Sequence, residues 1–460
     1  MSVPGEVRPI VHLALPVAAA QLGWMLIGLV DLWMVGRLGS DALAAVSLGD
    51  LWIVATLVVA MGVVMGIDPI VSQAHGAGLG PRAGAALQHG VVIALLLTPG
   101  ITAAWWLAGP ALLAAGQDPI LVESADSYIR AQAFSIAPFL VYIALRQYLQ
   151  GRGMMLPPLV IILAANLVNV ALNWVLIFGE LGFPALGVRG AAIASGLTRA
   201  FMMLSLVLAI VGLRLYEGAW EGWSRQAVSP RALVEVLRHG LPVGLQIGLE
   251  IWAFTLTTLF AGWLGTRALA AHTIVLKITS FSFMAAMGIS IACTTRVGNL
   301  IGAGQRSRAE KAAWTGLALA TAMMTGFALT FVIFRRSLPA IFVPRGTPAA
   351  MEVIVLGAGI LPIAAAFQVF DGFQAVASGV LRGMGTTRPS AVINFLGYYA
   401  LALPCALWLA FERLPGGIEG LGLGLRGIWL GLALGLAAVA ALLAFWLRLR
   451  GPSSLPPRPV

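Results

Sequence analysis

Long apolar runs alternate with short polar connections along the whole chain. A membrane-spanning helix needs about 20 apolar residues, and twelve runs reach that length, with approximate cores at 11–35, 47–70, 90–114, 124–148, 158–179, 189–212, 241–263, 270–295, 313–334, 353–380, 391–411 and 426–447. The runs lack the short alternating segments of membrane barrel strands. The pattern therefore predicts an all-α polytopic membrane protein with twelve transmembrane helices.

Composition agrees with a membrane protein. Hydrophobic residues make up 60% of the 460 positions and charged residues only 10%, whereas soluble proteins carry about 25% charged residues. The formal net charge of +10 comes from Arg and Lys scattered between apolar runs, without the basic stripe of a nucleic-acid-binding protein. We therefore expect the lipid bilayer as a partner and expect no binding to nucleic acid.

The placement of Arg and Lys predicts the orientation of the chain. If the N-terminus is cytoplasmic, most basic loop residues fall on the cytoplasmic side, as the positive-inside rule requires. Both termini are then cytoplasmic, and residues 448–460 form a cytoplasmic tail. Residues 213–239 are the only long polar stretch between spans. This stretch predicts a cytoplasmic linker between two lobes, 1–212 and 240–447.

The two predicted lobes repeat one another. The Leu-Pro-Val triplet at 15–17 returns at 241–243, which is 226 positions later (241 − 15). At the same shift the run 42–45 meets 268–271, and the Gly-Ala-Gly triplet at 76–78 meets 302–304. Six spans per copy is an even number, so both copies enter the membrane in the same direction. Parallel repeats of this kind are one way in which secondary transporters are built.

The repeated block resembles the multidrug and toxic compound extrusion (MATE) family of the MOP superfamily. The residues that carry the resemblance are the repeated Leu-Pro pairs, Val30-Asp31, the segments 39–45 and 265–271, Glu250, the segment 298–304, and Asp371 followed by 379–383. The acids of the seventh and tenth spans are similar to those of the NorM-type branch. The resemblance implies two six-helix lobes that export organic cations in exchange for Na⁺ or H⁺.

Several carboxylates lie within predicted spans, where a charge is costly and is usually functional, and three of them are the main candidates. They are Asp31, Glu250 and Asp371. At a shift of 226 positions, the repeat mate of Asp31 is Thr257 and that of Glu250 is Trp24. These two acids are therefore not part of the shared scaffold, and we expect them to serve ion or substrate binding.

A row of amides predicts the surroundings of the first acid. Asn166, Asn169 and Asn173 are spaced by three and four residues, which places them on one helical face. Carboxylate and amide oxygens suit a hard cation such as Na⁺. The resemblance implies that Asp31, Asn169 and Asn173 form a cation site, with Na⁺ or H⁺ as the coupling ion. The alternative role for the amides is hydrogen bonding between helices. The family's hydroxyl of span six has no certain match in this sequence, because the aligned positions are apolar, although Ser195 and Thr198 are both near.

The other two acids also have polar neighbours. Gln246 precedes Glu250 by one helical turn, and Gln368 and Gln374 flank Asp371. Glu250 and Asp371 are candidates for binding the coupling cation or an organic cation. The candidates for the wall of a substrate cavity are Gln246, Gln368, Gln374, Phe367 and Tyr399, the last two by location alone. The alternative is a structural salt bridge from Lys277 to one of the acids.

The expected function follows from these residues and the resemblance. We expect a monomeric exporter of small organic cations in a bacterial cytoplasmic membrane, with no cofactor beyond the coupling ion and no catalytic residues. An integral membrane enzyme would need a nucleophile–base pair or a metal-ligand cluster, and the sequence contains neither pattern. The remaining alternative is a flippase of lipid-linked oligosaccharides or a related amphiphile from the same superfamily.

Overall fold

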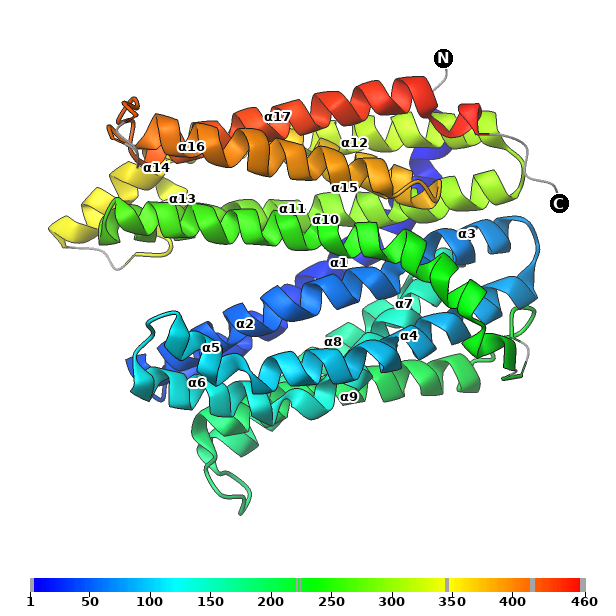
Figure 1. Cartoon of the computed structure of the whole chain (residues 1–460), viewed down its shortest axis with the longest axis horizontal. Helices are drawn as coiled ribbons and strands as arrows, with labels where there is room; N and C mark the ends of the chain where they lie inside the picture. Colours follow the sequence, from blue (N-terminus) through cyan, green and yellow to red (C-terminus); the bar gives the residue numbers. More distant parts are fainter. Residues whose placement is uncertain (1–3, 221, 224, 344–346, 414–417, 456–460) are drawn as a thin grey trace. The chain divides into compact units, whose positions relative to one another are not determined.

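The computed structural model describes residues 4–220, 222–223, 225–343, 347–413 and 418–455. The chain is helical throughout this part, apart from turns, loops and one isolated β-bridge between Arg413 and Glu419. Twelve helical segments are long and apolar enough to cross a membrane. The predicted all-α fold with twelve spans is therefore confirmed, and Figure 1 shows the helices as long rods.

Contacts divide the chain into two compact units. One unit is Ala19–Gly244, and the other combines Met1–Ala18 with Leu245–Val460. Two helices, α1 (Pro4–Gly36) and α10 (Pro230–Trp263), are shared between the units because a boundary falls inside each of them. The boundary residues Ala18 and Gly244 are repeat mates, since they are also 226 positions apart (244 − 18).

The unit Ala19–Gly244 contains most of the helices of the first repeat. Helix α8 packs against α9, and α4 packs against α7, so that their apolar faces form the core of this unit. Its elements besides the shared helices are α2 (Ser40–Val64), η1 (Met65–Ile67), α3 (Asp68–Gly76), α4 (Gly80–Trp106), α5 (Ala108–Ala114), α6 (Pro119–Ala131), η2 (Ala133–Ser135), α7 (Ile136–Gly151), α8 (Leu156–Phe178), α9 (Gly187–Gly212) and η3 (Arg225–Val228).

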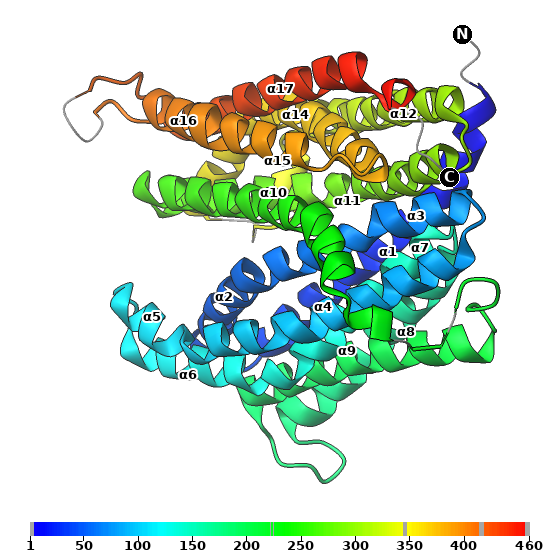
Figure 2. The ribbon, with the colours of Figure 1, turned by 45° about the vertical axis from the view of Figure 1, so that its right-hand side comes forward.

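The second unit is organised around a long central helix. Helix α14 packs against α11, α12 and α17, and α16 lies beside α17, as Figure 2 also shows. The elements are α11 (Thr266–Gly302), α12 (Arg306–Ile333), α13 (Ser337–Ala340), α14 (Pro348–Gly383), α15 (Arg388–Phe395), η4 (Leu396–Ala402), α16 (Leu403–Ala410), α17 (Leu425–Arg450) and η5 (Pro452–Ser454).

The sequence repeat is also a repeat of backbone conformation. Gly39 and its mate Gly265 precede equivalent spans with φ of 119° and 108°, and Gly78 and its mate Gly304 end them with φ of 71° and 73°. Such positive φ values are readily adopted only by glycine. The spans between them differ in one respect, because Ser40–Gly76 is interrupted by η1 ahead of Pro69, whereas Thr266–Gly302 is one unbroken helix.

Glycines allow equivalent close approaches of helices in the two units. A Cβ at Gly62 would collide with the backbone of Gly244 in the first unit. A Cβ at Gly288, the repeat mate of Gly62, would lie 2.7 Å from the Cβ of Ala18 in the second unit. Each crossing therefore uses a boundary residue of a shared helix, and small residues are needed at both.

A π-helical turn interrupts the eleventh span. Helices α15 and α16 are joined by η4, which has π geometry over Leu396–Ala402, and together they form the candidate span Arg388–Ala410. Pro404 follows directly after this turn. A proline in a helix removes one intrahelical hydrogen bond, and π turns occur frequently at functional sites. This turn carries Tyr398 and Tyr399.

Candidate functional site

Asp31 lies in a ring of polar side chains within the unit Ala19–Gly244. Its carboxylate is buried, with an exposed fraction of 7%. Oδ1 accepts hydrogen bonds from Asn169 Nδ2 at 3.0 Å and from Asn173 Nδ2 at 2.5 Å. Oδ2 accepts a hydrogen bond from Ser195 Oγ at 2.8 Å. Residues from α1, α8 and α9 therefore converge on one buried carboxylate.

The ring retains an acceptor without a donor. Asn173 Nδ2 also lies 3.2 Å from Asn169 Oδ1, while Asn173 Oδ1 is buried and has no hydrogen-bond partner among the described residues. A buried polar atom without a partner is costly. The carboxylate, amide and hydroxyl oxygens gathered here are of the kind that bind hard cations, so the donor set fits a small cation.

Two neighbouring polar residues have other roles. Asn166 Nδ2 donates to the carbonyl oxygens of Gly23 at 2.9 Å and of Ile162 at 2.8 Å, so this amide links α8 to α1. Thr198 Oγ1 donates to the Ala194 carbonyl of its own helix at 2.8 Å. The structure thus identifies Ser195, and not Thr198, as the hydroxyl that contacts Asp31, a choice that the sequence left open.

A buried arginine modifies the electrostatics around Asp31. The guanidinium of Arg199 donates to Ser135 Oγ at 3.2 Å and lies 5.3 Å from the centre of the Phe139 ring. It interacts electrostatically with both Asp31 and Asp50, but it forms no salt bridge with either in the described part of the chain. Asp31 is therefore under a positive field without being neutralised by direct contact.

The second unit contains a chain of hydrogen bonds that ends at Glu250. Gln374 Nε2 lies 3.4 Å from Glu250 Oε2 and donates to Asn394 Oδ1 at 2.7 Å. Asn394 Nδ2 donates to the Ser390 carbonyl, and Ser390 Oγ donates to Gln246 Oε1 at 2.9 Å. Residues of α10, α14 and α15 thus form one polar network, which includes Gln246 and Gln374 from the sequence prediction.

Asp371 belongs to the same region and is incompletely satisfied. Its side chain is 6% exposed, and Oδ1 has no hydrogen-bond partner among the described residues. The Gln374 Oε1 atom and the Tyr398 hydroxyl are also buried without a hydrogen-bond partner among the described residues. Asp371 and Glu250 interact through their charges. Two carboxylates that repel each other beside free acceptor oxygens are an arrangement that a bound cation or a proton would stabilise.

Arg382, and not Lys277, is the basic residue whose charge acts on Glu250. Lys277 is exposed and has no salt bridge among the described residues. Arg382 is buried, with an exposed fraction of 5%, and its charge acts on Glu250. Sequence reasoning missed Arg382 in this role, because it placed this residue beyond the tenth span at 353–380, whereas α14 continues to Gly383.

Three further predicted residues lie in the second unit. Gln368 Oε1 accepts from Ser282 Oγ at 2.6 Å, and the Phe367 ring packs edge-on against Trp429 at 5.6 Å in the core. The hydroxyl of Tyr399 donates to the Leu249 carbonyl at 3.1 Å. Whether these residues, with Gln246 and Gln374, line a substrate cavity stays a prediction.

The repeat places different chemistry at equivalent positions of the two units. Glu250 is the mate of Trp24 at the shift of 226 (250 − 24), and Asp371 is the mate of Phe139 at a shift of 232 (371 − 139) that also relates the ends of α7 and α14 (383 − 151). Trp24 and Phe139 stack with ring centroids 5.4 Å apart. An aromatic pair in one unit therefore corresponds to an acid pair in the other.

The fold and its duplicated halves define a polytopic membrane transporter. The sequence profile of the MatE family matches residues 16–175 and 242–408, and the chain belongs to the MATE family of multidrug and toxic compound extrusion transporters. It is a NorM-like multidrug resistance transporter, and not an enzyme.

Its relatives match over almost the whole chain. The probable multidrug resistance protein NorM of Mesorhizobium japonicum is 34% identical over 457 residues, covering 96% of this chain and 94% of the relative. That of Pseudomonas aeruginosa is also 34% identical, with coverage of 95% and 88%. The crystal structure of the eukaryotic MATE transporter AtDTX14 superposes with a TM-score of 0.87 at 23% identity, covering 97% and 96% of the two chains.

Proposed function

We propose that this chain exports organic cations from the cell in exchange for Na⁺ or H⁺. The observation that carries the proposal is the buried Asp31 carboxylate, held by Asn169, Asn173 and Ser195 within one unit. A charge buried in membrane-spanning helices is costly and is usually retained for function. The ring supplies oxygen ligands for Na⁺ and an acid that can take up a proton.

The second acid cluster supports competition between the ion and the exported cation. Glu250 and Asp371 repel each other and lack basic partners within salt-bridge distance in the described residues. A cation of either kind relieves this repulsion, so a bound ion and a bound organic cation exclude each other. Coupled exchange requires that the two ligands favour different states or compete in this way. Gln246, Gln368, Gln374, Phe367 and Tyr399 are the proposed neighbours of the organic cation.

The proposed orientation places both termini in the cytoplasm of a bacterial cell, with the protein as a monomer in the cytoplasmic membrane. The positive-inside distribution of Arg and Lys supports it. In this arrangement the lobes are 1–212 and 240–447, the linker 213–239 and the tail 448–460 are cytoplasmic, and the linker residues 221 and 224 and the tail residues 456–460 lie outside the described part.

Transport in liposomes tests this function. The purified full chain is reconstituted, and uptake of a fluorescent organic cation is followed under an imposed Na⁺ gradient alone or H⁺ gradient alone. We expect uptake with at least one gradient and none in protein-free liposomes. Absence of uptake under both gradients, combined with scrambling of a labelled lipid-linked oligosaccharide, would favour the flippase instead.

A further inference from the structure

A cavity of about 970 Å³ lies in the second unit, at the end of the helices opposite the C-terminal end of α17. It is enclosed by α13, the start of α14 and the residues that follow α12. Its floor is apolar and includes Met351, Ile354 and Val355, while Arg335 and Arg336 stand at one side. The volume is at the upper end of the range of about 300–1,000 Å³ that is common for small-molecule sites.

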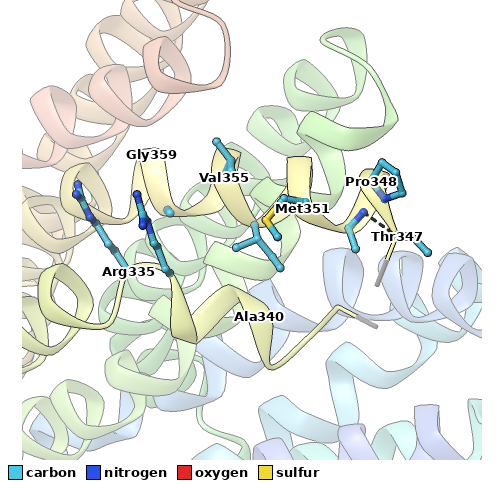
Figure 3. A pocket seen from close by; sticks show the side chains of 11 residues that line it. Arg335, Ala340, Thr347, Pro348, Met351, Val355 and Gly359 are labelled. Atoms are coloured by element: carbon cyan, nitrogen blue, oxygen red, sulfur yellow. Dashed lines mark hydrogen bonds between the residues drawn. The ribbon is translucent and has the colours of Figure 1, made fainter. Parts of the chain in front are cut away.

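Two guanidinium groups line this cavity, and a third lies beside its lining residue Gly359. Arg335 and Arg336 line it, and Figure 3 shows the Arg335 side chain directed toward α14 near Gly359. A Cβ at Gly359 would lie 3.4 Å from Arg426 Nη2, so the absence of a side chain there leaves room for the third guanidinium. No acid is among the described residues that line the cavity.

The three arginines have no anionic partner within the described chain. No ion pair or hydrogen bond joins Arg335, Arg336 or Arg426 to another described residue. The neighbouring acid Glu352 is paired with Arg267 on α11. All three side chains are exposed, and like charges that gather in one place repel one another, so an anion from outside the chain would stabilise the arrangement.

The border of the cavity indicates where that anion comes from. Large apolar side chains next to it are exposed, including Ile333 at 70%, Ile341 at 73%, Met351 at 61% and Val355 at 62%. In a membrane protein such side chains face lipid. A soluble anion would gain nothing from these surfaces, whereas an amphiphile would bury its chains there.

We propose that this cavity binds an anionic glycerophospholipid. The phosphate lies among Arg335, Arg336 and Arg426, where guanidinium groups form paired hydrogen bonds to phosphate oxygens. The acyl chains lie along the apolar floor on α14. In the proposed orientation this is the outer leaflet, where the positive-inside rule disfavours basic residues, and lipid binding explains why three of them are kept together there.

Native mass spectrometry of the full chain in neutral detergent tests the proposal, with dioleoyl phosphatidylglycerol and dioleoyl phosphatidylcholine as probes. We expect the wild-type chain to prefer phosphatidylglycerol. In Arg335→Gln/Arg336→Gln the affinity for phosphatidylglycerol should fall about 30-fold, taking about 1 kcal/mol for each lost arginine, while affinity for phosphatidylcholine stays constant. The matched control is Arg189→Gln/Arg413→Gln, which removes the same charge at positions that the sequence places on the outer side, and it should keep the preference.

A second variant keeps the arginines and changes the floor. Val355→Asp places a carboxylate in the cavity that Arg335 and Arg336 line, so the preference for phosphatidylglycerol should be lost. The thermal unfolding temperature in detergent shows whether this variant is folded. Equal binding of the two lipids by the wild-type chain would overturn the proposal, as would an equal loss in the control. Competition by glycerol 3-phosphate at the concentration at which the lipid binds would also overturn it, because the site would then take a soluble phosphate.

Discussion

The hydroxyl of Ser195 on α9 donates a hydrogen bond of 2.8 Å to Oδ2 of Asp31 on α1. The two residues are 164 positions apart in the sequence and meet only because α9 packs in the same unit as the second part of α1. Asn169 and Asn173 both bond to Oδ1, and among the described residues Ser195 alone bonds to the other oxygen. The hydroxyl therefore fixes the orientation of the carboxylate.

Ser195→Ala should weaken binding of the coupling ion. Loss of a hydrogen bond to a charged group costs about 1.5–3 kcal/mol, which corresponds to at least a tenfold higher ion concentration for half-maximal uptake. The matched control is Thr198→Ala on the same helix, because among the described residues the Thr198 hydroxyl bonds only to the carbonyl of Ala194. The measurement is uptake by liposomes over a series of Na⁺ or H⁺ concentrations. An equal effect of the two substitutions would contradict the role given to Ser195.

Asp31→Asn should abolish exchange while leaving the protein in the membrane. The amide is nearly the same size as the carboxylate, but it carries no charge and takes up no proton near neutral pH. Efflux and resistance of cells that express the variant should fall to the level of cells without the transporter, at equal amounts of protein in the membrane. Asp41→Asn, at an exposed position at the start of α2, is the control. Wild-type resistance in Asp31→Asn cells would disprove the ion site.

Glu250 and Asp371 should behave as one unit in a double-mutant cycle. Their charges interact, so neutralising one removes the repulsion that makes cation binding to the other favourable. Glu250→Gln and Asp371→Asn should each impair transport strongly, and the double variant should be little worse than either one, which is the non-additivity expected of coupled residues. Initial rates of organic-cation uptake supply the numbers. Independent, multiplicative effects would show that the acids act separately.

Arg382 and Lys277 should differ sharply when neutralised. Arg382 is buried and acts on Glu250, so Arg382→Gln should change the ion concentration needed for half-maximal uptake. Lys277 is exposed and has no salt bridge in the described chain. In Lys277→Gln, the ion concentration for half-maximal uptake should therefore stay within about twofold of the wild-type value, as is usual for surface substitutions. A large effect of Lys277→Gln would restore the ion-pair alternative.

The fold could be predicted from the sequence because the length and the hydropathy of the apolar runs determine it. Spans of about 20 apolar residues can only be helices in lipid, and the repeat at 226 positions is visible without coordinates. The backbone confirms it at the glycine pairs Gly39–Gly265 and Gly78–Gly304. The interruption of the second span at η1 was missed, although Pro69 marks it in the sequence.

The contacts of the candidate site were harder to predict. Periodicity places Asn166, Asn169 and Asn173 on one face of a helix, but a face is wide enough for different partners. Asn166 bonds to the backbone of α1, and the other two bond to Asp31. To choose Ser195 over Thr198, one must know how α9 is rotated about its own axis. That rotation depends on the packing of α9 against several helices at once.

Gly62→Ala should destabilise the protein, against the usual preference of helices for alanine. A methyl group at Gly62 would collide with the backbone of Gly244, and one at Gly288 would lie 2.7 Å from the Cβ of Ala18. Overpacking of this kind costs about 1–3 kcal/mol, so Gly62→Ala and Gly288→Ala should each lower the thermal unfolding temperature in detergent. Gly326→Ala on α12 is the matched control, because no atom lies within 4 Å of the position that its Cβ would occupy. Alanine should there retain its helix preference of about 0.5–1 kcal/mol. If Gly62→Ala were as stable as Gly326→Ala, the close approach of α2 to α10 at Gly62 and Gly244 would be refuted.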